Sequence, residues 1–175
     1  MDFFGATEER YSHKEKFLLT AVPLADLEKI AKAGLSAPTG NNSQCVRLVI
    51  LPDRQALQPL CDIAPTDGMQ TVPAAIAVFT ENSKQNWKVN FEVEDYSAAA
   101  TSMLLAATAL GYSSLWLDSP FFDASKQKAA CEALNAPLGF TMRVVLLIGL
   151  ADGVGTRREK LPFDERVSYG RFGEQ

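Results

Sequence analysis

Histidine and cysteine are scarce in this sequence. His13 is the one histidine, and the three cysteines are far apart, with no Cys-x-x-Cys pair. Because metal sites rely on clustered His and Cys ligands, we expect no metal centre. A Ser-His-Asp triad would need His13, which lies among charged residues and is expected to be exposed, and no Gly-x-Ser-x-Gly motif supports one. The odd cysteine count argues against disulfides and favours reduced thiols in a cytoplasmic protein.

Long runs of basic or apolar residues are also missing. The 17 Lys and Arg residues are outnumbered by 21 Asp and Glu residues, so the formal net charge is -4 and the pI about 5.1. A positive surface for nucleic acid is therefore not expected. The most apolar segment, residues 144–150, is far shorter than the ~20 residues that cross a bilayer as a helix. The acidic N-terminus does not resemble a signal peptide, and we expect no membrane association.

Glycine motifs that bind nucleotides are absent too. Gly153 and Gly155 form an isolated Gly-x-Gly without the third glycine and the strand–turn–helix context of a dinucleotide fingerprint, and no Gly-Lys-[Ser/Thr] occurs. What remains is an ordinary globular composition, 47% hydrophobic and 22% charged. We expect the 175 residues to form one domain, 1–175.

Hydrophobic periodicity predicts alternating helices and strands. Apolar residues at three- and four-residue spacing indicate helices, and short apolar runs bounded by turn residues indicate strands. The expected helices cover residues 23–34, 54–62, 91–112 and 123–134, and the expected strands cover 46–51, 74–79, 113–117 and 143–150, with a turn at 65–68.

The segment 91–112 gives the strongest helix signal. It begins with Glu92, Glu94 and Asp95, acids that favour the positive end of a helix, and continues as a nearly uncharged stretch rich in Ala and Leu. Such a helix is buried on most sides. Because a lone domain of this size offers few places to bury it, we expect it to lie in a homodimer interface.

Three polar clusters are candidates for a binding site. In the first, Arg10, Ser12 and Lys14 alternate, so an extended chain would direct all three side chains to one side. A guanidinium, a hydroxyl and an ammonium together suit a phosphate group. The alternative is a solvated N-terminal segment without a ligand, and spacing alone favours this alternative.

The second cluster is the stretch from Pro38 to Gln44. Thr39, Asn42 and Gln44 can each donate and accept hydrogen bonds, and Gly40 lets the backbone approach a ligand closely. Such a set could bind the edge of a heteroaromatic ring. The alternative is a polar connector whose side chains cap a neighbouring helix or bond their own backbone.

The third cluster follows the last expected strand. Arg157, Arg158 and Lys160 place three cations close together, which is usually the mark of an exposed charged loop. By contrast, Arg54 and Arg171 are expected to be isolated surface charges.

In their order along the chain, these features resemble the nitroreductase family of FMN-dependent oxidoreductases. The family's Arg-Arg-Ser-x-Arg is similar to residues 10–14, and its Pro-Ser-Ser-x-Asn-x-Gln-Pro-Trp is similar to residues 38–46. Its Asp-x-x-x-Ala helix, ending in Leu-Gly, is similar to residues 95–111, and its basic pair before Leu-Pro is similar to residues 158–162.

Several residues depart from the family pattern. Lys14 stands for the second arginine, Gly40 for a serine, and Cys45-Val46 for Pro-Trp. Asp118 lies where many members carry glycine, in a loop expected to face the flavin N5 atom. A carboxylate there could repel an anionic reduced flavin or select the substrate. The chain is also short for the family, so the helical lid over the pocket is expected to be reduced.

The resemblance implies an α+β fold with three layers. A mixed, mostly antiparallel sheet would be flanked by helices, in an intertwined homodimer with two FMN molecules at the subunit interface. Residues 38–44 would contact the ribityl chain and ring edge from the other subunit, and the basic clusters would hold the phosphate and the N1–O2 side of the ring. The implied cofactor-binding residues are Arg10, Ser12, Lys14, Pro38, Thr39, Gly40, Asn42, Gln44, Asp118, Arg158 and Lys160.

The implied activity needs no catalytic side chain. Hydride from NADH or NADPH would pass through flavin N5 to an electron-poor small molecule, such as a nitroaromatic or a quinone, in a ping-pong cycle. Three alternatives remain open: a non-catalytic flavin-binding or storage protein, a specialised flavin-dependent dehydrogenase or dehalogenase, and a dimeric interaction module without a cofactor.

Overall fold

A four-stranded antiparallel sheet forms the centre of the computed structural model, which describes residues 1–81 and 90–173. The strand order is β1-β2-β4-β3, and each neighbouring pair is antiparallel. Among the described residues, parallel pairing is limited to an isolated bridge between Ser12 and Ser114. The strands are β1 (Val46–Leu51), β2 (Ala74–Glu81), β3 (Ser113–Leu117) and β4 (Phe140–Gly149).

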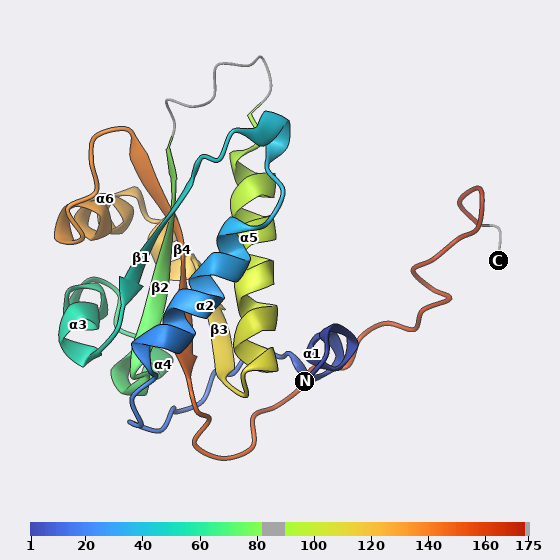
Figure 1. Ribbon diagram of the computed structural model, residues 1–175, viewed down its shortest axis with the longest axis horizontal. Coiled ribbons are helices and arrows are strands. Elements are labelled where there is room, and N and C mark those ends of the chain that lie inside the picture. Colours follow the sequence, from blue (N-terminus) through green and yellow to red (C-terminus); the bar gives the residue numbers. More distant parts are fainter. Residues whose placement is uncertain (82–89, 174–175) are drawn as a thin grey trace.

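Helices cover both faces of this sheet, as the three-layer expectation requires (Figure 1). On one face lie α2 (Leu24–Leu35) and α5 (Glu92–Ala109), which share a hydrophobic cluster with the strands. On the other face lie α3 (Arg54–Ile63), α4 (Asp67–Thr71) and α6 (Ala124–Ala133), around a second cluster. The central strand β2 is buried along most of its length, because both of its faces are covered.

The predicted helices and strands are confirmed to within a few residues, and two short helices are additional. The first is α1 (Phe3–Glu9), whose N-terminus is capped by the Asp2 carboxylate, which accepts from the Gly5 amide at 2.8 Å. The second is α4, which begins inside the predicted turn at 65–68 because the Thr66 hydroxyl caps it by accepting from the Met69 amide.

Helix α5 is buried or half-buried along most of its surface within a single chain, and its exposed residues are Val93, Glu94 and Thr101. Its buried apolar residues, such as Ala100 and Met103, face the sheet and α2, and Gly34 of α2 has no room for a Cβ atom beside Met103. Val93 is 59% exposed, and the outer side of the last turns lines an apolar cavity of about 280 Å³ against α1. The expectation of burial on most sides is therefore met for most of the helix within one chain, and burial of the remaining outer side in a dimer stays a prediction.

The two ends of the chain lie side by side. The Leu18 amide donates to the Leu150 carbonyl, and the Asp152 amide donates to the Lys16 carbonyl, both at 2.9 Å. The segments thus run antiparallel at the edge of the fold. Beyond them, the C-terminal arm, defined as residues 161–173, leaves the body of the molecule (Figure 1). The arm carries exposed aromatic residues, and Phe172 is fully exposed.

Candidate functional site

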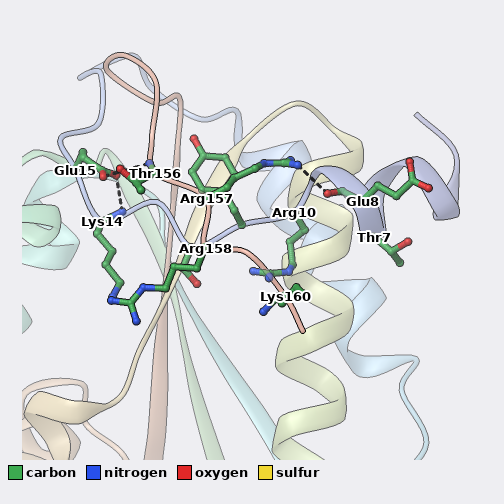
Figure 2. A pocket seen from close by; sticks show the side chains of 11 residues that line it. Thr7, Glu8, Arg10, Lys14, Glu15, Thr156, Arg157, Arg158 and Lys160 are labelled. Atoms are coloured by element: carbon green, nitrogen blue, oxygen red, sulfur yellow. Dashed lines mark hydrogen bonds between the residues drawn. The ribbon is translucent and has the colours of Figure 1, made fainter. Parts of the chain in front are cut away.

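The pairing of the chain ends brings the first and third polar clusters into one cavity of about 590 Å³ (Figure 2). Its floor and walls come from the end of α1, the extended segment after it, and the segment that follows β4. Five basic side chains line it: Arg157 and four others, here called the basic quartet, which are Arg10, Lys14, Arg158 and Lys160. Ser12 also lines this cavity, so five of the predicted binding residues share one site.

Glu8 and Glu15 also line the cavity, but neither is paired with a member of the basic quartet. Within residues 1–81 and 90–173, none of its four members forms an ion pair, whereas the neighbouring Arg157 pairs with Glu9 at 2.7 Å. Like charges gathered in one cavity repel one another, and an anion bound among them would remove that repulsion. The geometry therefore suits a multiply charged anion such as a phosphate group.

Glu15 forms the acidic rim of this basic cavity. Its carboxylate accepts from the Lys14 amide at 3.0 Å and from the Thr156 amide at 3.5 Å. The pKa of Glu15 is lowered, first by a hydrogen bond from its own backbone amide and further by those from Lys14 and Thr156. Glu15 therefore stays ionised near neutral pH, and it links the N-terminal segment to the segment after β4.

His13 lies inside the protein, so the expectation that it is exposed is wrong. Its side chain is fully buried, and its ring packs against Phe17 with centroids 4.7 Å apart. The Nε2 atom lies 2.8 Å from the Lys16 carbonyl, to which it can only donate. An extended segment directs alternate side chains to opposite sides, so the alternation that brings Arg10, Ser12 and Lys14 to the cavity directs His13 inward.

The second polar cluster lines a separate cavity of about 1040 Å³. Residues 38–44, here called the polar loop, contribute Pro38, Thr39, Asn42 and Gln44 to it. Asn42 and Gln44 both have left-handed backbone conformations, with φ of 53° and 47°. Such conformations cost about 1–2 kcal/mol for a residue with a side chain, so the surrounding structure has to hold this loop in place.

A buried carboxylate, Asp95, supplies that support. Its Oδ1 atom accepts from the Gly40 amide at 2.7 Å, and its Oδ2 atom accepts from the Ser43 hydroxyl at 2.7 Å and from the Cys45 thiol at 3.3 Å. Burial raises the pKa of the Cys45 thiol, which therefore remains protonated and able to donate. From the sequence, Asp95 was expected only to favour the helix N-terminus; its spacing gave no signal for this second role.

One residue of the polar loop, Thr39, behaves as the alternative interpretation expects. The Thr39 hydroxyl accepts from the Gln44 amide at 3.2 Å, a bond within the loop itself. Gly40 does not line the cavity, and a Cβ atom there would lie 2.4 Å from the Phe91 ring. The close approach that Gly40 permits is therefore to Phe91.

Asp118 lies apart from both cavities. It follows β3 at the end opposite Ser114, which bridges to Ser12 beside the basic cavity. Its carboxylate accepts from the Trp116 indole at 2.7 Å, and this bond fixes the direction of the charge. One chain therefore does not bring Asp118 together with the basic quartet.

The two cavities lie at opposite ends of α5. Asp95, in the first turn, holds the polar loop, whereas α1, which leads into the basic cavity, packs against the last turns around Ala106 and Ala109 (Figure 1). The helix has 18 residues, so its ends are roughly 27 Å apart at 1.5 Å per residue. Within one chain the polar loop cannot touch a small ligand held by the basic quartet.

The described parts of the chain, 1–81 and 90–173, contain no group of three or more His, Cys, Asp or Glu side chains placed to hold a metal ion. Over the same residues, no helix has the length and apolar character needed to cross a bilayer.

Known structures place this fold among the nitroreductases. A structure titled "FMN-dependent Nitroreductase" from Clostridium difficile R20291 superposes with a TM-score of 0.79 at 23% identity, covering 97% of this chain and 99% of that one. A structure from Desulfovibrio desulfuricans, titled as a "putative nitroreductase in complex with fmn", gives a TM-score of 0.83 at 22% identity, covering 98% of each chain.

Sequence comparison then identifies the family. Residues 7–82 match the model of the Nitroreductase family. A protein of Archaeoglobus fulgidus named "Putative NADH dehydrogenase/NAD(P)H nitroreductase" is 32% identical over 126 residues, which is 71% of each chain. The present chain belongs to the nitroreductase family.

Proposed function

We propose that this protein is an FMN-dependent oxidoreductase that uses NADH or NADPH. The observation that carries the proposal is the basic quartet, whose four cations converge from both ends of the chain without a carboxylate partner within residues 1–81 and 90–173. Family membership and the FMN named for two of its structural neighbours support the same cofactor.

The residues of the basic cavity fit the phosphate end of FMN. Arg10 and Arg158 can each present a planar guanidinium with several donors, while Lys14 and Lys160 add ammonium charges. The Ser12 hydroxyl can donate to a further oxygen. A phosphate carries close to two negative charges at neutral pH, so the quartet can neutralise it and still favour negative charge elsewhere on the cofactor.

A second copy of the chain would supply the rest of the site. Because the polar loop lies at the far end of α5, a homodimer that aligns one copy's loop with the other's basic cavity would place Thr39, Asn42 and Gln44 against the ribityl chain and ring edge. The C-terminal arm is available to such a partner, since it leaves its own body with Phe163 and Phe172 exposed.

The chemistry that FMN supplies when bound is hydride transfer from NAD(P)H to an electron-poor acceptor, such as a nitroaromatic or a quinone. The protein's part is to bind and orient. Its cations lie where they can stabilise negative charge on the cofactor, an effect that is larger in a partly desolvated site than in water. Asp118, oriented by Trp116, is proposed to bias which acceptors approach.

Absorption spectroscopy tests this proposal. The purified protein, supplied with FMN and freed of excess, should retain roughly one FMN per chain, as a preformed site implies. Addition of NADPH or NADH without oxygen should bleach the visible absorption of the oxidised flavin, and an added quinone should restore it. Bound FMN that neither nucleotide reduces would favour a storage protein, and failure to bind FMN would contradict the proposal.

A further inference from the structure

Arg157 lines the basic cavity (Figure 2) but differs from the basic quartet, because both of its terminal nitrogens donate to protein groups. Its Nη1 atom donates to the Glu8 carbonyl at 3.0 Å. Its Nη2 atom donates to the Glu9 carbonyl and to the Glu9 carboxylate, the latter at 2.7 Å. The guanidinium also lies over the Tyr11 ring, 5.5 Å from its centre.

These bonds close the C-terminal end of α1. The last carbonyls of a helix have no partner within the helix, and α1 has no basic residue of its own in its last turn. Arg157 supplies the missing donors and a positive charge at the end of the helix where positive charge is favourable. The residue that follows this end is Arg10, the C-cap of α1 and a member of the quartet.

In the segment that follows β4, Arg157 immediately precedes Arg158. The backbone before it is already fixed, since Gly155 packs so closely that a Cβ atom would lie 2.4 Å from the Tyr11 ring, and the Thr156 amide donates to Glu15. Arg157 thus bonds the N-terminal part of the chain directly before the segment that carries Arg158 and Lys160.

We infer that Arg157 is a positioning residue for the anion site, an inference that rests on the proposed FMN function. Its charge is largely satisfied by Glu9 and the two carbonyls, so it contributes little direct attraction to a phosphate. By bonding the end of α1, it holds the segment that carries Arg10 against the segment that carries Arg158. The phosphate affinity therefore depends on a contact between residues at opposite ends of the sequence.

A double-mutant cycle separates positioning from direct contact. Arg157→Ala should weaken FMN about tenfold, the loss of roughly one charge-assisted bond, and weaken riboflavin little. In a protein that already carries Arg10→Ala and Arg158→Ala, the same change should cost less than about threefold, because the groups it positions are gone. Arg157→Lys should fall in between, since lysine can pair with Glu9 but cannot bond both carbonyls. Lys126→Ala, which removes an exposed cation on α6, far from the basic cavity, is the control.

Additive losses of FMN affinity in the two backgrounds would overturn the inference, because they would mean that Arg157 contacts the phosphate itself. Equal losses for FMN and riboflavin would also overturn it. Hydrogen exchange of the Arg10 amide, which donates to the Ala6 carbonyl at 3.0 Å, gives a readout without ligand. This amide should exchange faster in Arg157→Ala, and an unchanged exchange rate would contradict the positioning role of Arg157. Failure of the wild-type protein to bind FMN would instead refute the proposed function, while the exchange result would still test the contact.

Discussion

At the scale of single residues, the direction of each side chain in the N-terminal segment determines the site. The alternation of Arg10, Ser12 and Lys14 could be predicted from the sequence, and all three line the basic cavity. The same alternation should have placed His13 on the opposite side, yet its charged neighbours suggested an exposed residue. Sequence position alone does not reveal that the Phe17 ring and the Lys16 carbonyl form a buried environment for it.

Arg10→Ala should weaken FMN by about ten- to a hundredfold, because one charge-assisted bond to a phosphate contributes on the order of 1.5–3 kcal/mol. Riboflavin, which lacks the phosphate, should lose much less affinity. Both affinities can be measured by quenching of flavin fluorescence. Lys126→Ala is the control, since Lys126 is exposed on α6, far from the basic cavity, and isolated surface charges contribute weakly.

Arg54 is unsuitable as a second control, contrary to the expectation from sequence. It is half-buried, and its guanidinium donates to the Met69 and Val72 carbonyls at the end of α4. Its removal would disturb the fold of α4. An FMN-to-riboflavin affinity ratio that Arg10→Ala leaves unchanged would show that the segment 10–14 does not bind the phosphate.

At the scale of elements, periodicity was sufficient for the longer helices and all four strands, because their apolar faces repeat over many residues. Helix α1 was not predicted because only Ala6 of its seven residues is buried, so its sequence shows no periodic apolar face. The hydrogen bonds from the polar loop to Asp95 were not predicted either, since Gly40 and Asp95 are 55 residues apart in sequence.

Asp95→Asn should destabilise the polar loop. The new amide would keep one acceptor but could no longer accept from both Ser43 and Gly40, and leaving buried donors without partners costs about 1–3 kcal/mol. The free energy of unfolding, measured with urea, should fall by this amount. FMN and riboflavin should both bind more weakly, because the loop is expected to contact the part of the cofactor that they share.

Glu94→Gln provides the matched control for this change, since Glu94 lies in the same turn of α5 but is exposed. It should alter the unfolding free energy by less than about 0.5 kcal/mol. Wild-type stability in Asp95→Asn would contradict the role assigned to this carboxylate.

At the scale of the whole molecule, the predicted cofactor-binding residues are divided between two separate cavities. The resemblance to the nitroreductase family was needed to expect that the two ends of the chain meet, because no local pattern encodes a contact such as Arg157 with Glu9, 148 residues apart. The basic quartet and the polar loop lie at opposite ends of α5, and we therefore propose that a complete site takes one part from each of two chains. This requirement is the central claim of the proposed function.

Complementation between two defective variants tests that claim most directly. One variant carries Arg10→Ala and Arg158→Ala, the other Thr39→Ala and Asn42→Ala, and each homodimer should bind FMN weakly. A purified heterodimer, with a different affinity tag on each chain, should combine one intact site with one doubly defective site. Isothermal titration should then find one FMN per heterodimer at close to wild-type affinity. Two equally weak sites, with no site of wild-type affinity, would show that each site is built within one chain and would contradict the account.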